Sequence, residues 1–466
     1  MPVQRERKSG LLFPTIGFNS TNGLLWRQPL YLVLSENRDV TLYLDYQGRK
    51  GLGQALEYRY IERYAGEGNL WLYHIRDRQA HRDYFELKAE HRRSGASGLT
   101  GFLKLNLINR KDFYSTFSHR VEAWSSRFLQ STAQIALNKR TYQLYIDGRF
   151  WQELRQGHQT GEIHQQLPEI GFYYYPERHN PLYISTQVSL VNYHSVELSR
   201  VRRLDIYPVF RHSLGKTFRF SQSLGLRGTF YWISNTDQYP DTEQRASFDY
   251  NVSLKTLFRR EFGRYTHIVE PELFYSFIPE TVDDIPSVDG VDSYDRLSLL
   301  GLSINNYLYR GPQMLASMRI TEPYDFHGGD RPLRPVRLQL RLFEPLDLTS
   351  EFSYNTEDGR IDRANITVSK TIRDFSISLS QRYSRDYDIL FYNGSVTVPV
   401  TRKLNLSGSV WYDAKGEGMK NYRVALSYQS QCWGIKVTYD KRPGDYSLYV
   451  LLQFKGLGEL KLESFI

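Results

Sequence analysis

The stretch VRLQLRL, residues 336–342, alternates an apolar and a polar side chain at every position. Successive side chains of a β-strand point to opposite faces, so this segment has one apolar face and one polar face. The same alternation recurs at 364–369, 375–380 and 404–409, and in further stretches along the whole chain. The pattern predicts that strands make up nearly all of the protein.

The number and length of these segments indicate how the strands are arranged. We count roughly 26 segments of about ten residues, the length of a tilted strand that crosses a membrane. Aromatic residues make up 15% of the chain and hydrophobic residues only 40%, and the mean hydropathy is -0.53. That composition fits a barrel in which half of each strand faces water. We predict an all-β, transmembrane antiparallel β-barrel of about 26 strands, closed between its first and last strands, with residues 1–466 as one outer-membrane barrel domain.

Other architectures fit less well. A stack of soluble β-sandwiches would need domain boundaries, which the sequence lacks. A transmembrane helix is excluded because no stretch approaches ~18 uninterrupted apolar residues. The N-terminal residues MPVQRERKSG lack the apolar core of a signal peptide. Because an outer-membrane barrel requires such a signal, we expect the chain to be a fragment of a longer protein.

The turns are unequal in length, as in membrane barrels. Asn22-Gly23 predicts a tight turn, and long polar loops are expected near 150–163, 279–294 and 321–333. Aromatic residues at membrane interfaces commonly form girdles. We expect such positions for Trp71 with Tyr73 and for Tyr173-Tyr174-Tyr175.

The charge and the chemical motifs argue against nucleic-acid binding and catalysis. The net charge is +9, but Lys and Arg are scattered singly, which suits an anionic lipid or glycolipid surface or simply a solvated one. Hydrolase and nucleotide-binding motifs are absent, so we expect no enzyme and no cofactor. An outer-membrane lipid hydrolase with a Ser–His pair on neighbouring strands is the remaining catalytic alternative. Asp325, His327 and Asp330 are interpreted as a polar loop, and we expect no metal site.

The first hairpin, RKSGLLFPTIGFNSTNGLLWRQPLY at 7–31, carries a proline on each strand, Pro14 and Pro29. Proline has no backbone N–H and interrupts a ladder of hydrogen bonds. Counting back from the turn places the two prolines at similar heights. In a closed barrel the first strand pairs with the last, so Pro14 is expected to weaken that closing seam and Pro29 the strand beside it. Edge or bulge prolines are the alternative interpretation.

The last strand of the predicted barrel lies in DYSLYVLLQFKGL. Its alternating residues Leu448, Val450, Leu452 and Phe454 are predicted to form the other side of the seam. An aromatic residue near the end of a last strand is similar to the signal that outer-membrane assembly machinery recognises.

Four stretches resemble the LptD family of lipopolysaccharide-assembly proteins, specifically its outer-membrane barrel. They are the first hairpin with both prolines; VEPELFYSFIPE with Glu270, Pro271, Tyr275 and Pro279; VDSYDRL with Asp292, Ser293, Asp295 and Arg296; and ALSYQSQCWGIKVTYDKR followed by LLQFKGLGEL. The chain departs from the family where two adjacent cysteines are common: Gln431 replaces the first and only Cys432 remains.

The resemblance implies a translocon of the Gram-negative outer membrane that inserts lipopolysaccharide into the outer leaflet. Sugars would pass through the lumen, and acyl chains would leave through a lateral gate at Pro14 and Pro29. It implies an LptE-type lipoprotein plug, the barrel assembly machinery, and an LptA-type bridge that docks on a periplasmic domain missing from this chain. At most one interdomain disulfide can form, from Cys432; without its partner a free thiol is expected. We further hypothesise that Arg337 and Arg341 contact lipid A phosphates. A passive porin or substrate-specific pore is the alternative function.

Overall fold

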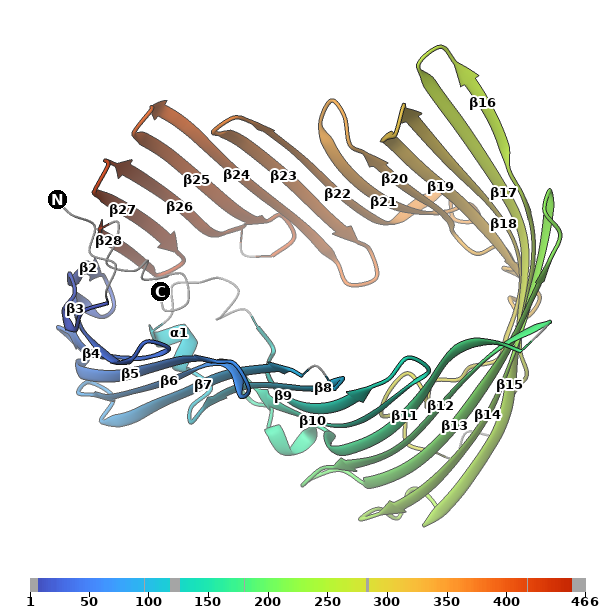
Figure 1. Cartoon of the computed structure of the whole chain (residues 1–466), viewed down its shortest axis with the longest axis horizontal. Helices are drawn as coiled ribbons and strands as arrows, with labels where there is room; N and C mark the ends of the chain where they lie inside the picture. Colours follow the sequence, from blue (N-terminus) through green and yellow to red (C-terminus); the bar gives the residue numbers. More distant parts are fainter. Residues whose placement is uncertain are drawn as a thin grey trace.

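The computed structural model describes residues 7–95, 97–117, 126–179, 181–281, 285–416 and 418–454. Its strands form one antiparallel sheet that closes into a barrel (Figure 1). Consecutive strands pair along the chain, and β2 (Thr15–Asn19) pairs with β28 (Asp445–Phe454) to close the ring. These pairings confirm the predicted antiparallel barrel and its closure between the first and last strands. No helix within the described ranges is long and apolar enough to cross a membrane.

The described residues contain 28 strand segments, and these fill 26 strand positions. Two positions are each divided between two segments: β1 and β2 both pair with β3, and β15 and β16 both pair with β17. The predicted number of strands is therefore confirmed. Residues 1–6 and 455–466, which belong to the predicted barrel domain, lie outside the described ranges.

The elements of the first part of the chain are β1 Gly10–Leu11, β2 Thr15–Asn19, β3 Gly23–Ser35, β4 Arg38–Gln47, β5 Gly51–Glu62, β6 Gly66–Asp77, β7 Arg82–Ser94, β8 Leu99–Ile108, α1 Phe113–Phe117, β9 Phe128–Asn138, β10 Tyr142–Glu153, the 3-10 helix η1 Thr160–Glu162, β11 Gln165–His179, β12 Leu182–His194, β13 Arg200–Leu214 and β14 Phe218–Ser234.

The remaining strands are β15 Thr242–Thr256, β16 Phe258–Phe262, β17 Tyr265–Ile278, β18 Leu297–Arg310, β19 Gln313–Asp325, β20 Val336–Leu342, β21 Asp347–Asn355, β22 Arg360–Ile372, β23 Phe375–Ser384, β24 Ile389–Thr401, β25 Leu404–Asp413, β26 Gly418–Gln429, β27 Trp433–Arg442 and β28 Asp445–Phe454.

The two ends of the barrel differ in the length of their connections. At one end, here called the short-turn end, strands are joined by turns such as 36–37 and 311–312, and β1 begins and β28 ends there. At the other, the long-loop end, the connections include 109–127 and 279–296. This is the asymmetry of outer-membrane barrels. Two predicted loops begin later than expected, because 150–153 belong to β10 and 321–325 to β19.

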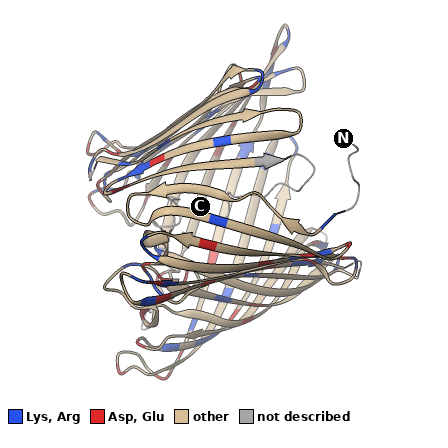
Figure 2. Ribbon diagram, turned by 90° about the vertical axis from the view of Figure 1, so that its left-hand side faces the viewer, with Lys and Arg blue, Asp and Glu red and all other residues tan. Residues whose placement is uncertain are grey.

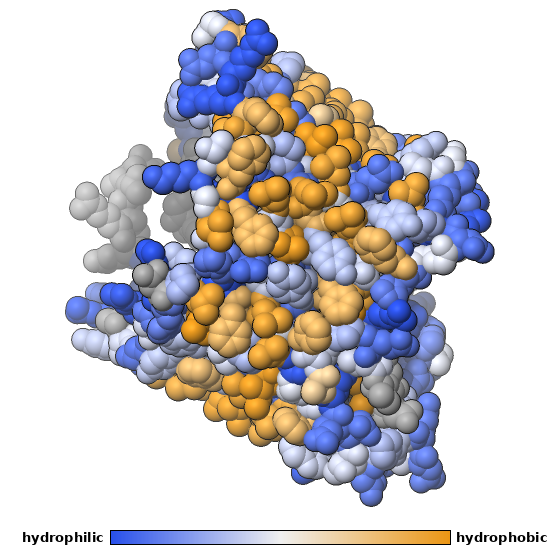
Figure 3. Space-filling model, turned by 90° about the vertical axis from the view of Figure 1, so that its right-hand side faces the viewer, coloured by the Kyte–Doolittle hydropathy of each residue, from blue (hydrophilic) through white to orange (hydrophobic). Residues whose placement is uncertain are grey.

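The wall of the barrel has a polar face and an apolar face. On β4, Thr41, Tyr43 and Asp45 are buried, whereas Leu42 and Leu44 are exposed. Charged residues gather at the ends of the strands and are only scattered along them (Figure 2). On the opposite side of the barrel, a belt of hydrophobic residues runs across the middle, between hydrophilic borders (Figure 3). The apolar face is thus the outer, lipid-facing one, as the alternation predicted.

Pro271 explains why one strand position is divided into β15 and β16. Both segments pair with β17 in the same register, which would place Thr256 opposite Pro271. Proline has no N–H to donate, so the ladder stops at Lys255 and resumes at Phe258.

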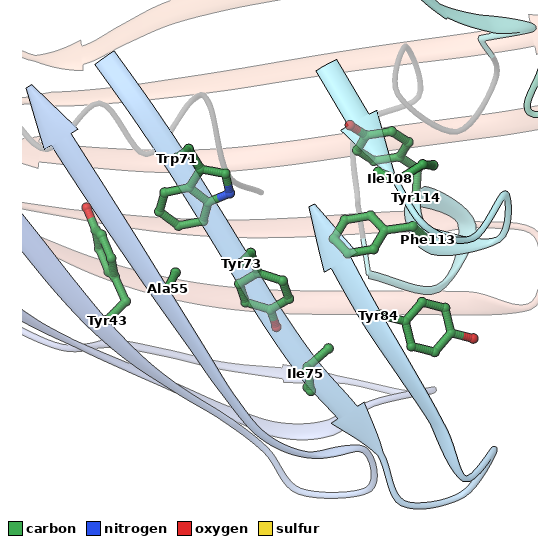
Figure 4. Close-up of a cluster of buried hydrophobic side chains, with 9 residues drawn as sticks. All are labelled: Tyr43, Ala55, Trp71, Tyr73, Ile75, Tyr84, Ile108, Phe113 and Tyr114. Carbon is green, nitrogen blue, oxygen red and sulfur yellow. The ribbon is translucent and has the colours of Figure 1, made fainter. Parts of the chain in front are cut away.

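The helix α1 lies inside the ring, against the inner surface of the first strands (Figure 1). Its residues Phe113 and Tyr114 complete a cluster of buried side chains contributed by β4 to β8 (Figure 4). Trp71 and Tyr73 belong to this cluster and are 5% and 6% exposed. Their predicted place in an interfacial girdle is wrong: both lie on the lumen face of β6, opposite the exposed Leu72, in the cluster that α1 completes.

Candidate functional site: the seam between the first and last strands

The seam is the junction of β2 with β28, and its ladder is short. Four residue pairs join the two strands, from Ile16 opposite Val450 to Asn19 opposite Ser447. On its other side, β28 forms ten pairs with β27, up to Phe454 opposite Trp433. Within the described residues, the part of β28 beyond Val450 therefore pairs with β27 alone. The seam is closed toward the long-loop end and unpaired toward the short-turn end.

Pro14 lies where the seam ladder ends. The Ser20 N–H donates to the Tyr446 carbonyl at 3.0 Å. N–H groups directed at one neighbouring strand recur at every second residue of an antiparallel strand. The N–H groups of Phe18 and Ile16 therefore also face β28, and the next position that should do so is residue 14. Residue 14 is proline, so the donor that would extend the ladder does not exist.

A bulge lies at the same place, between β1 and β2. Between the paired positions Leu11 and Thr15, the first strand has one residue more than β3 has opposite it. The Leu12 N–H therefore donates to the carbonyl of Pro29 at 3.0 Å. The return bond would need an N–H at Pro29, and the Gln28 side chain replaces it by donating to the Leu12 carbonyl at 2.7 Å. Both prolines thus remove main-chain donors, one facing β28 and one facing β1.

The paired part of the seam is held by a buried polar group, which we call the Asp445 lock. The Asn19 side-chain amide donates to the Asp445 carboxylate at 2.8 Å and to the Ser447 hydroxyl at 2.9 Å. The Ser20 hydroxyl donates to the same carboxylate. Asn19 is fully buried and Asp445 is 4% exposed. Arg442, at the end of β27, also donates to Asp445, at 2.9 Å, so the acceptor is fixed in place.

Asn19 also shapes the turn of the first hairpin. Its side-chain oxygen accepts the N–H groups of Thr21 and Asn22 at 2.8 and 2.6 Å. This local arrangement is typical of Asn at turns and fixes the side chain before it meets Asp445. The Asp445 lock is not predictable from the sequence, since no local pattern connects residues 19 and 445.

The seam presents different chemistry to the lumen and to the membrane. On the inner face, Tyr449 covers Gly17; a Cβ added to Gly17 would lie 2.6 Å from the Tyr449 ring. On the outer face, Ile16, Phe18 and Leu448 are 47%, 39% and 42% exposed. An apolar outer surface beside a weakened ladder is suited to contact with acyl chains.

Only part of the predicted last-strand seam pairs with the first strand. Leu448 and Val450 pair with β2, whereas Leu452 lies beyond the last seam pair and is opposite Ile435 of β27. The backbone of Phe454 is also paired with β27.

Arg337 and Arg341 lie on β20, on the face opposite Leu338 and Leu340. Because the outer face of the barrel is apolar, these arginines are directed to the lumen. Arg341 lines a recess of about 360 Å³ together with Arg319 and Glu351. The recess is on a different part of the wall from the seam, and its mixed charge includes a carboxylate beside the two guanidinium groups. The structure places Arg337 outside the recess lining.

Cys432 is exposed in the turn between β26 and β27, at the short-turn end. The described chain begins and ends at this same end of the barrel. Asp325 belongs to the end of β19, where its carboxylate accepts the His327 N–H at 2.9 Å and pairs with Arg334.

A second inward-folded loop lies far from the seam, between β17 and β18. Asp292 pairs there with Arg203 of β13 at 2.7 Å, and both side chains are almost fully buried. Asp289 binds the same guanidinium at 2.6 Å. Burial by itself would raise the pKa of Asp289, but hydrogen bonding and the charge of Arg203 outweigh it and lower the pKa to about 2. The loop is therefore attached to the wall by charge-assisted bonds.

Asp292 belongs to one of the stretches that carried the family resemblance, and the structure gives it a physical role. Arg296, from the same stretch, pairs with Glu280 at 2.8 Å. Tyr294 donates to Asp249 of β15 at 2.7 Å, and burial together with that carboxylate raises the pKa of Tyr294. The partners Arg203 and Asp249 were not predicted, because the pattern of a strand does not reveal which lumen charge meets which loop.

The fold and the seam define the chain as an outer-membrane β-barrel. The profile of the family described as LptD: LPS transport system D matches residues 82–301. Curated relatives include the LPS-assembly protein LptD of Ralstonia nicotianae, 22% identical over 98% of this chain and 64% of the relative. The corresponding proteins of Azoarcus sp. and Vibrio vulnificus are 23% and 20% identical, over 97% and 94% of this chain and 63% and 65% of theirs.

The chain is similar to the LptD family, over the region of its outer-membrane barrel. It spans just under two-thirds of the length of those relatives. The barrel fold and this similarity to transport proteins confirm the expected localisation in the outer membrane and the expectation that the chain is not an enzyme.

Proposed function

We propose that this barrel inserts lipopolysaccharide into the outer leaflet of the outer membrane, with the seam between β2 and β28 as a lateral gate. One observation carries the proposal: four residue pairs close the seam, and the ladder ends where Pro14 removes the next donor. Unpaired main-chain groups are costly in a lipid environment. Among the junctions between the described strand positions, the seam has the fewest residue pairs to separate, which lowers the cost of opening it.

The two parts of lipopolysaccharide would take different routes. Its acyl chains would pass between β2 and β28, where Ile16, Phe18 and Leu448 already face the membrane. Its sugars and phosphates would remain in the polar lumen, where Arg337 and Arg341 are candidates to contact the phosphates of lipid A. Arginine suits that role because its guanidinium matches phosphate geometry.

Further partners follow from the family and from the two ends of the barrel. The short-turn end of an outer-membrane barrel faces the periplasm. Cys432 is at that end, where a disulfide to a periplasmic domain of the family would join the barrel to an LptA-type bridge. An LptE-type lipoprotein would occupy the lumen, and the barrel assembly machinery would insert the chain.

A cross-link across the seam tests the gate. Phe18→Cys and Leu448→Cys place two thiols at directly paired positions, in a Cys432→Ser background that has no other cysteine. We expect oxidation to stop the appearance of lipopolysaccharide at the cell surface and reduction to restore it. The matched control joins Val424 to Tyr439, a pair between β26 and β27, in the same way. Normal export through the oxidised seam would refute the gate.

A passive pore without lateral exit is the alternative function, and the same variants separate it from a translocon. Small solutes would enter vesicles equally well through the oxidised and reduced barrels if the chain were a pore.

Restoring the missing donor gives an independent test. Pro14→Thr offers an N–H to β28, and one added hydrogen bond contributes about 1 kcal/mol, or roughly a fivefold shift toward the closed seam. We expect export to slow by a similar factor. Pro399→Thr, on β24 and away from the seam, is the matched control. Equal effects of the two replacements on export would argue against a specific role of Pro14.

A further inference from the structure

We infer that α1 is a clasp that holds both hairpins flanking the seam. The inference rests on the proposed lateral gate and adds a control element to it. The clasp consists of the Ser115 and Thr116 carbonyls of α1, with Asn22 from the first hairpin and Arg442 from the last.

The contacts of the clasp come from opposite sides of the seam. The Asn22 side-chain amide, in the turn between β2 and β3, donates to the Thr116 carbonyl at 3.0 Å. Arg442, at the end of β27, donates to the Ser115 carbonyl at 3.1 Å. The last carbonyls of a helix have no partners within the helix, so they are available as acceptors. Two adjacent carbonyls of one short helix therefore bind the two elements that must separate when the gate opens.

The helix itself is held by a third part of the barrel. The Phe113 ring lies edge-on to Tyr73, with centroids 6.0 Å apart. The Tyr114 hydroxyl donates to Glu86 of β7 at 2.8 Å, and the Tyr84 hydroxyl donates to Asp112 at 2.9 Å. These contacts fix α1 to the inner wall, as Figure 4 shows for the aromatic residues. The clasp thus ties both sides of the seam to strands β6 and β7.

The Asn22 side chain takes part in the clasp and not in the Asp445 lock, so replacing Asn22 tests the clasp alone. Its side chain is 1% exposed and reaches across to the loop, whereas the Asp445 lock involves Asn19 and Ser20. Each hydrogen bond lost should favour the open seam by roughly three- to tenfold. Any ligand that displaces α1 from the wall would have the same effect, so the occupancy of the lumen would control the seam.

The test measures opening directly, in the 466-residue chain in proteoliposomes. Spin labels at Leu44→Cys on β4 and Val424→Cys on β26, in the Cys432→Ser background, report the distance across the seam; both positions are exposed on the outer face. Asn22→Ala should increase the population with long distances by roughly three- to tenfold. Asn192→Ala is the matched control, since it removes an amide-to-carbonyl bond, to Leu167, on a distant strand.

A second variant separates the clasp from a general loss of stability. Phe113→Ala releases the helix from the wall while leaving both hairpins intact. If α1 acts as a clasp, Phe113→Ala opens the seam to the same extent as Asn22→Ala, and the double variant opens it no further. Additive effects of the two changes, or a distance distribution for Asn22→Ala equal to that for Asn192→Ala, would overturn the inference. Because the distances are measured without lipopolysaccharide, a failed clasp leaves the proposed gate standing, and a failed cross-link experiment leaves the clasp testable.

Discussion

Among single side-chain replacements in the Asp445 lock, removal of the Asp445 carboxylate should increase the population of the open seam most. Asp445 accepts two hydrogen bonds from the first strand, from Asn19 and from Ser20. A hydrogen bond to a charged group contributes about 1.5–3 kcal/mol, and the lower value applies near the barrel end, where water is close. Two such bonds amount to about 3 kcal/mol, or on the order of a hundredfold in the ratio of open to closed seam.

The same spin-labelled barrel measures this change. Asp445→Ala should convert a minor long-distance population into a major one, because Asn19 loses one of its two buried acceptors. Asp445→Asn keeps a neutral acceptor and should show a smaller increase. Asp440→Ala is the matched control: Asp440 is equally buried on β27 and pairs with Arg423 and Asn421, away from β2.

The outcome that refutes the reasoning is a distance distribution for Asp445→Ala that matches the Asp440→Ala control. That result would mean that the few main-chain pairs of β2 with β28 hold the seam without help from the Asp445 lock.

Two further predictions concern the inner face of the barrel. Gly17→Ala should widen the seam, because the new Cβ would lie 2.6 Å from the Tyr449 ring; Gly10→Ala, with nothing within 4 Å of the added Cβ, should leave the label distances unchanged. The loop around Asp289 should stay attached to the wall at neutral pH and loosen as the pH falls from about 4 toward 2. The reason is that Arg203 lowers the folded-state pKa of Asp289 from 3.8 to about 2, so the stabilisation is complete above the unfolded value and is lost as the carboxylate protonates. The expected loss is only about 1 kcal/mol, since 36% of the Asp289 side chain is exposed and its charge is screened. Hydrogen exchange of the loop measures it, and an Asp289→Asn barrel that kept the same pH dependence would contradict the assignment.

Local pattern was sufficient to predict the architecture. Alternation such as VRLQLRL requires a sheet with one wet and one apolar face, and β20 occupies that stretch, Val336–Leu342. Strand length and number then favoured a barrel with 26 positions, and the structure has them. The unusual prolines of the first hairpin were also visible, because a missing N–H is a property of the residue itself.

The pattern failed where a side chain's environment depends on a distant segment. The alternation of Trp71 and Tyr73 fits a lipid-facing side as well as a lumen-facing one. In the structure both side chains belong to the buried cluster that α1 completes inside the barrel. Charge pairing is equally nonlocal: Arg203 meets Asp292 across 89 residues of sequence.

The sequence by itself determined that this protein is a barrel that resembles the LptD family, with a donor missing from each strand of its first hairpin. Those properties follow from side-chain periodicity and from the covalent structure of proline, which need no tertiary context. Only the tertiary structure decided that the seam retains four paired positions, that Asp445 locks Asn19 and that α1 contacts both hairpins. These contacts join segments more than 90 residues apart, and closure of the barrel is what brings them within hydrogen-bonding distance.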